Sequence, residues 1–195
     1  MTPPPMPPWS GMHVLLVHFP IALLIVAPLL MFIAMFFQKK FPGMAFIACL
    51  VLFLGTIAAW VTMKTGGAAF EEAATDNQAG QALMHEHQEM GEKVPWMFTG
   101  LFVAYLLVLL LPLMIKRLKP VTVRIFGTLL ILVPYAFAAI YLSNTAHKGG
   151  LLVHFYGIHA DTAESVVAEK AAEAAQNAPA PPAPAPGPEA TTHPT

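Results

Sequence analysis

This 195-residue chain has little charge and a single cysteine. Charged residues make up 11% of it, whereas soluble domains carry about 25%. One cysteine excludes a disulfide framework and any cysteine-built zinc or iron–sulfur site within the chain. A formal net charge of −1 provides no basic field, so we expect no nucleic-acid partner. With 56% hydrophobic residues, the composition indicates a small integral membrane protein whose partner is the lipid bilayer.

Four stretches contain no Asp, Glu, Lys or Arg: residues 11–38, 41–63, 94–115 and 125–146. Each reaches the roughly 20 residues needed to cross a hydrocarbon core of about 30 Å. We therefore predict an all-α, four-helix membrane bundle with spans at about 12–37, 43–63, 95–115 and 122–144. A leader at 1–11 precedes the membrane domain at 12–160, and an Ala/Pro-rich tail occupies 161–195.

The charges between the spans are sorted by sign. The loops after the first and third spans hold six of the ten basic residues and no acidic residue, and all eleven acidic residues lie elsewhere. By the positive-inside rule, both short loops face the cytoplasm, and both termini face out. The run APAPPAPAPGPEA in the tail favours extended conformers over a packed core, so we expect the tail to be disordered.

The loop before the third span has helical spacing. In GQALMHEHQEMGEK, residues 80–93, the side chains of Leu83, His87 and Met90 share one face, and His85 lies on the opposite, polar face. This pattern predicts an amphipathic helix lying across the outer mouth of the bundle. It also favours His87 over His85 as the histidine that faces inward.

The histidines are the most informative residues. None of the eight falls in the cytoplasmic half of a span. His18 is the deepest, and an imidazole inside an apolar span is a functional candidate by default. His147 shares a face with Ile140 and Asn144, so we expect it to point into the bundle, and Gly149-Gly150 should end or bend that helix. The candidate cofactor ligands are His13, His18, His87, His147 and His154.

Two small-xxx-small pairs, Gly55/Ala59 and Gly100/Ala104, suggest that the second and third spans approach each other closely. No internal repeat is recognisable in the sequence.

Three segments resemble domain-of-unknown-function family 2231, a set of bacterial four-helix membrane proteins. They are MHVLLVHFPIALL in the first span, HQEMGE before the third and HKGGLLVHFYGI after the fourth, and together they cover residues 12–160. The chain departs from the family pattern at Val14, where proline is common, and at His154, where tyrosine is frequent. The resemblance implies a location in the bacterial inner membrane. It also implies a candidate b-type haem carrier, because related domains occur beside cytochrome c domains.

Two classes of function remain. The first is an electron-transfer subunit that holds haem b between two neutral imidazoles from different helices, or a copper or other transition-metal site built from the same histidines. Its partner would be an outer-face cytochrome or a larger membrane complex. The second class is a non-redox accessory subunit or small permease whose histidines only form hydrogen bonds. The sequence contains no nucleophile elbow, HExxH motif or phosphate loop, so we do not expect a stand-alone catalyst.

Overall fold

The computed structural model describes residues 6–41, 43–73, 77–115 and 119–158, together with Ala168 and Ala172. In these ranges the chain forms five helices: α1 (Met12–Leu16), α2 (His18–Phe37), α3 (Met44–Glu72), α4 (Gln78–Met114) and α5 (Pro120–His154). The helix α1 is the first turn of a long apolar span that breaks at Val17 and continues as α2. The break follows Leu16, whose carbonyl loses its helical partner because Pro20 has no N–H.

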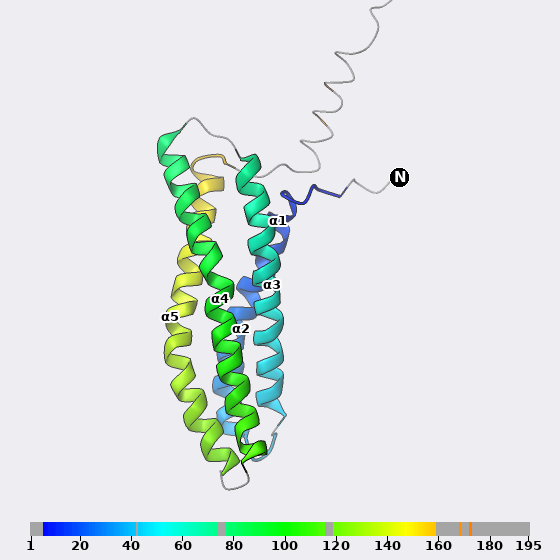
Figure 1. Cartoon of the computed structure of the whole chain (residues 1–195), viewed down its shortest axis with the longest axis vertical. Coiled ribbons are helices and arrows are strands. Elements are labelled where there is room, and N and C mark those ends of the chain that lie inside the picture. Colours follow the sequence, from blue (N-terminus) through cyan, green and yellow to red (C-terminus); the bar gives the residue numbers. More distant parts are fainter. Residues whose placement is uncertain are drawn as a thin grey trace, which may run out of the picture. The chain divides into compact units, whose positions relative to one another are not determined.

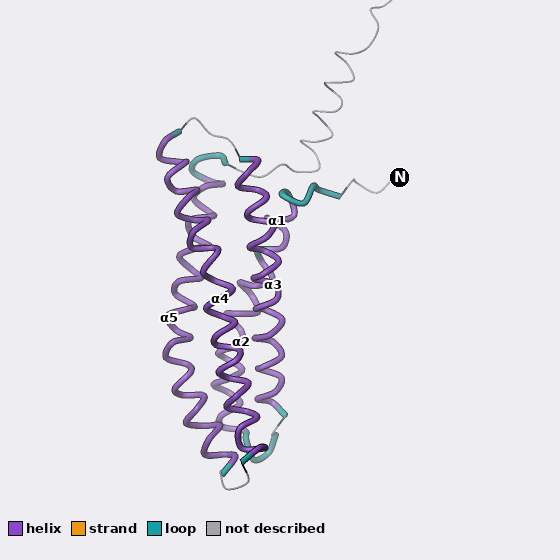
Figure 2. The backbone as a smooth tube through the Cα atoms, viewed as in Figure 1, coloured by secondary structure: helices purple, strands orange, loops and turns teal. Residues whose placement is uncertain are grey.

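Four helices form a closed ring. Each of α2, α3, α4 and α5 packs against its two neighbours in that order, α5 returns to α2, and α1 packs against α3 and α2. Figures 1 and 2 show the consequence: α1, the end of α3, the start of α4 and the end of α5 gather at one end. We call this the histidine end. The opposite end, which carries Lys39, Lys40, Lys119 and Arg124, is the basic end.

The structure confirms that each of the four apolar stretches is helical. The helices α3, α4 and α5 also extend beyond the predicted spans at the histidine end. Residues 80–93 are helical, as predicted, yet they form the first part of α4 and do not make a separate helix across the bundle mouth. At the end of α5, Gly149-Gly150 neither ends nor breaks the helix, which runs on to His154. The predicted tail, 161–195, lies outside the described residues except for Ala168 and Ala172.

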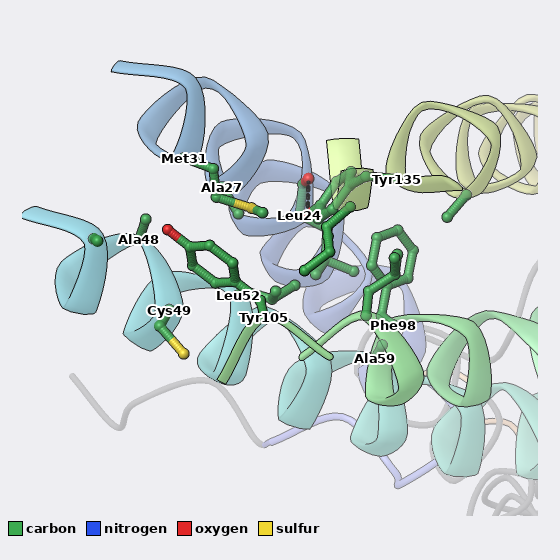
Figure 3. Close-up of a cluster of buried hydrophobic side chains, with 14 of the residues drawn as sticks. Leu24, Ala27, Met31, Ala48, Cys49, Leu52, Ala59, Phe98, Tyr105 and Tyr135 are labelled. Carbon is green, nitrogen blue, oxygen red and sulfur yellow. Dashed lines mark hydrogen bonds between the residues drawn. The ribbon is translucent and has the colours of Figure 1, made fainter. Parts of the chain in front are cut away.

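A buried tyrosine links α2 to α5 where a backbone hydrogen bond of α2 is missing. Pro28 lies inside α2 and has no N–H, so the carbonyl of Leu24 lacks its usual helical donor. The hydroxyl of Tyr135 donates to this carbonyl at 2.7 Å, shown by the dashed line in Figure 3. The Tyr135 ring packs edge-on against Phe98 of α4, with ring centres 5.5 Å apart. The free carbonyl is therefore satisfied by a side chain from a neighbouring helix, which fixes α2 against α5 and α4.

The two predicted glycine contacts behave differently. A Cβ atom on Gly55 would lie 2.8 Å from Leu24 Cδ2, so the close approach is real but joins α3 to α2 and not to α4. Gly100 is exposed, and a Cβ atom there would have no neighbour within 4 Å. The prediction of a contact at Gly100 was wrong.

This difference supplies a matched pair of substitutions. Gly55→Leu should destabilise the bundle by about 1–3 kcal/mol, because the new side chain overpacks the contact with Leu24. Gly100→Leu should leave stability unchanged or slightly raised, since it adds apolar surface on an open face and improves helix propensity. Thermal unfolding in detergent measures both. Equal melting temperatures for the two variants would contradict the packing of α3 against α2.

Candidate functional site

The first site histidine, His13, lies in α1 and bonds to α3. Its Nδ1 atom is 3.1 Å from the carbonyl oxygen of Thr62, and the hydroxyl of Thr65 lies 3.4 Å from the same nitrogen. A carbonyl can only accept, so Nδ1 donates and Nε2 is left without a hydrogen. The ring fits against Gly66, where an added Cβ atom would lie 2.9 Å from His13 Cε1. Only a residue without a side chain leaves room for the imidazole there.

The second site histidine, His87, lies in α4 and bonds to α5 in the same way. Its Nδ1 donates to the carbonyl of Thr145 at 3.0 Å, and its Cε1 lies 2.9 Å from the Cβ position of Gly149. Beside it, Lys148 and Glu86 form an ion pair of 2.8 Å that also links α5 to α4. His87 is therefore held in one tautomer and one orientation, again with Nε2 unprotonated.

The two imidazoles lie next to each other at the histidine end, in an edge-to-face arrangement. Their ring centres are 6.4 Å apart and their planes are inclined at 79°. Two opposed metal–imidazole bonds of about 2.0–2.1 Å, with about 1.1 Å from each nitrogen to its ring centre, would give roughly 6.3 Å. The observed separation therefore matches that of two imidazoles on opposite sides of one metal ion.

The environments of the two histidines are copies of each other. Each ring meets a threonine carbonyl and, four residues later, a glycine, in segments that read TMKTGG at 62–67 and TAHKGG at 145–150. These segments are 83 positions apart, and His13 and His87 are 74 positions apart. The sequence therefore does contain a repeat, which is hard to recognise because it is confined to a few positions and its two spacings differ.

The same spacings relate the buried positions of the helix pairs. With an offset of 74 residues, three buried positions of α2 correspond to three buried positions of α4: Leu24, Ala27 and Met31 correspond to Phe98, Leu101 and Tyr105. With an offset of 83 residues, four buried positions of α3 correspond to four buried positions of α5: Ala45, Ala48, Leu52 and Ala59 correspond to Thr128, Ile131, Tyr135 and Leu142. Equivalent helices occupy opposite places in the ring, so an approximate twofold axis runs along the bundle and between the two imidazoles.

Three other predicted ligands lie apart from this pair. His18 was expected to face the bundle interior, but it is exposed, and its Nδ1 donates to the carbonyl of Val14 in the preceding turn at 3.0 Å. His147 was expected to face inward with Ile140, yet both are exposed. His154, the last residue of α5, is exposed as well.

Of the three remaining histidines, the structure describes His85 alone. His85 is exposed, as the helical spacing predicts, and its ring packs against Phe70 with centres 5.0 Å apart. His159 and His193 lie outside the described residues. Within the described part of the chain, no group of three or more His, Cys, Asp or Glu side chains could hold a metal ion. Among the described residues, an ion held by His13 and His87 would have these two protein ligands and no third.

Fold and site together define a multi-pass membrane protein with a paired histidine site at one end. All four spans are long and apolar enough to cross a bilayer: Met12–Phe37, Met44–Glu72, Gln78–Met114 and Pro120–His154. Residues 10–162 match the profile of a family described as "Predicted membrane protein (DUF2231)", and the chain belongs to this family. The resemblance noted in the sequence is thereby confirmed. Neither the curated proteins nor the solved structures contain a match to this chain.

Proposed function

We propose that this protein is a membrane-bound b-type haem protein, an electron-transfer subunit in which His13 and His87 provide the two axial ligands through Nε2. The opposed imidazoles, 6.4 Å apart between ring centres, carry this proposal. Haem held between two imidazoles supplies reversible one-electron transfer. The protein contributes two ligands from different helices and an apolar bundle around them.

The hydrogen bonds of the two rings support ligation. A histidine that binds a metal almost always donates its other ring N–H to a carbonyl, a carboxylate or water, which fixes the tautomer and makes the free nitrogen more basic. His13 and His87 both have this arrangement, with backbone carbonyls as acceptors. Those carbonyls belong to long helices, so the rings have little freedom to turn.

The number of ligands favours haem over a bare transition-metal ion. Copper and other ions bound only by protein usually take three or four side chains, whereas the described residues bring together two. Haem iron has four porphyrin nitrogens of its own and needs two axial ligands from the protein. A pair of histidines on a twofold axis provides ligands for both faces of such a ring.

We also propose that the histidine end faces the outer side of a bacterial inner membrane. The support is the sorted charge: Lys39, Lys40, Lys119 and Arg124 lie at the basic end, as the positive-inside rule expects of the cytoplasmic side. An electron partner would then be an outer-face cytochrome or a larger membrane complex.

A second candidate is a non-redox accessory subunit, in which the same hydrogen bonds have a purely structural role. The bonds from His13 to α3 and from His87 to α5 tie helices together without any cofactor. In that role Nε2 has no required partner.

An absorption spectrum distinguishes the two candidates. After gentle extraction and purification, we expect a Soret band that shifts on reduction and about one haem per chain by pigment extraction. Haem retention should weaken as the pH falls well below the ~6.5 of free histidine, because only neutral imidazole ligates a metal. A protein with neither a Soret band nor stoichiometric metal would overturn the haem proposal and leave the accessory role.

A further inference from the structure

The basic end contains one buried charge. Arg124, near the start of α5, is 8% exposed, and no other charged side chain among the described residues is buried. Its guanidinium lies over the ring of Phe46 in α3, 5.4 Å from the ring centre. Its Nε atom is buried and has no hydrogen-bond partner among the described residues. The ring of Phe46 stabilises the cation from one side, but no described group accepts the Nε hydrogen.

No acidic residue in the described part of the chain lies at the same end as Arg124. The first acidic residue in the sequence is Glu71, and none occurs between Lys93 and Asp161. Arg124 contacts Phe46, and Glu71 lies about 37 Å further along the same helix, at 1.5 Å per residue. A buried charge without a partner is strongly unfavourable. The described residues supply no compensating anion, which points to an anion bound from outside the chain.

An apolar groove begins beside this cation. Phe46, whose ring carries the guanidinium, also lines an open groove of about 190 Å³ between α3 and α4, and the other lining residues are Cys49, Leu50, Phe53 and Phe102. Both helices qualify as membrane spans, so this groove faces the acyl chains of a bilayer. At the same end, the amide of Gln38 is buried with no hydrogen-bond partner.

We infer that the basic end binds one anionic phospholipid, with its phosphate on Arg124 and an acyl chain in the groove between α3 and α4. A guanidinium binds phosphate oxygens through paired N–H donors, and its charge is compensated by the headgroup. Anionic lipids are also the molecules that basic segments meet at the cytoplasmic surface of a membrane. This site is separate from the histidine pair and does not depend on haem binding.

Thermal unfolding of the delipidated full-length protein in detergent tests the site. Added phosphatidylglycerol should raise the melting temperature by several degrees, because a ligand that binds only the folded state stabilises it. Inorganic phosphate tests the phosphate group alone, and diacylglycerol tests the acyl chains alone. Both should give much smaller shifts. If inorganic phosphate reproduces the whole shift, the site is a free-phosphate site and the lipid proposal is overturned.

Two variants assign the shift to Arg124. Arg124→Gln should lose the response to phosphatidylglycerol, while Lys119→Gln, which removes an exposed charge at the same end, should keep it. Arg124→Lys retains the charge without the paired donors and should show a reduced response. If Arg124→Gln does not fold, native mass spectrometry of the Lys variant should still show fewer retained lipids than the unaltered protein. An unchanged response in the Arg124 variants would refute the proposal.

Discussion

Replacing either His13 or His87 with Ala should remove haem from the purified protein. Each substitution deletes an axial ligand, so the loss of affinity should exceed the roughly 10–100-fold that follows from disturbing a group behind a ligand. Absorbance at the Soret band per mole of protein measures the effect. His18→Ala and His147→Ala should keep full occupancy, because both side chains are exposed and away from the pair.

The variant His87→Met distinguishes loss of a haem ligand from misfolding of the Ala variants. Methionine is itself a haem ligand, and a Met/His pair raises the reduction potential relative to two histidines. We expect this variant to retain haem with a higher midpoint potential, which a purely structural role for His87 would not produce. Full haem occupancy in both Ala variants would exclude the pair as ligands. Loss of haem in His18→Ala alone would instead identify His18 as the haem ligand.

Haem affinity should also depend on the glycine that packs against each imidazole ring. Gly149→Ala places a methyl group 2.9 Å from Cε1 of His87, so the imidazole or α5 has to move. We expect haem affinity to fall about 10–100-fold, as it does when the support of a ligand is disturbed. The next residue is the control: a Cβ atom on Gly150 meets nothing within 4 Å. Gly150→Ala should keep haem and gain up to about 1 kcal/mol of stability from helix propensity.

The equivalent pair on α3 provides an independent repetition. Gly66→Ala should weaken haem binding through His13, and Gly67→Ala should not, because a Cβ atom on Gly67 has no neighbour within 4 Å. Haem titration of the apoprotein and thermal unfolding together separate affinity from stability. Equal behaviour of Gly66→Ala and Gly67→Ala would show that the fit of the ring against the helix has no role in binding.

Charge and spacing were sufficient to predict the four apolar helices and the inward orientation of His87. The stretches without charged residues located all four spans, because a charged side chain in the hydrocarbon core is costly. Helical spacing separated His87 from His85, since that part of α4 has the mixed polar and apolar faces of a helix outside the bilayer. Its neighbour in the pair, His13, was a candidate but ranked below His18.

The same reasoning failed for the histidines of α2 and α5. His147 was placed inward because it shares a face with Ile140, yet lipid accepts apolar side chains, and Ile140 is 61% exposed. The inner face of α5 is marked instead by small and hydroxyl residues such as Ala138 and Thr145, which allow helices to approach. His18 was favoured because it lies deepest in its span, but its ring donates a hydrogen bond to the carbonyl of Val14 in the same span. Neither local bonding nor the orientation toward lipid can be read from hydrophobicity alone.

The division of the pair between two equivalent helix pairs also determines when the site can exist. His13 belongs to the first part of the chain to be synthesised, whereas the Thr145 carbonyl that orients His87 belongs to the last helix. Either helix pair alone contains one of the two paired imidazoles. A group that binds both rings would therefore require all four helices to have packed, and it would hold the two helix pairs together.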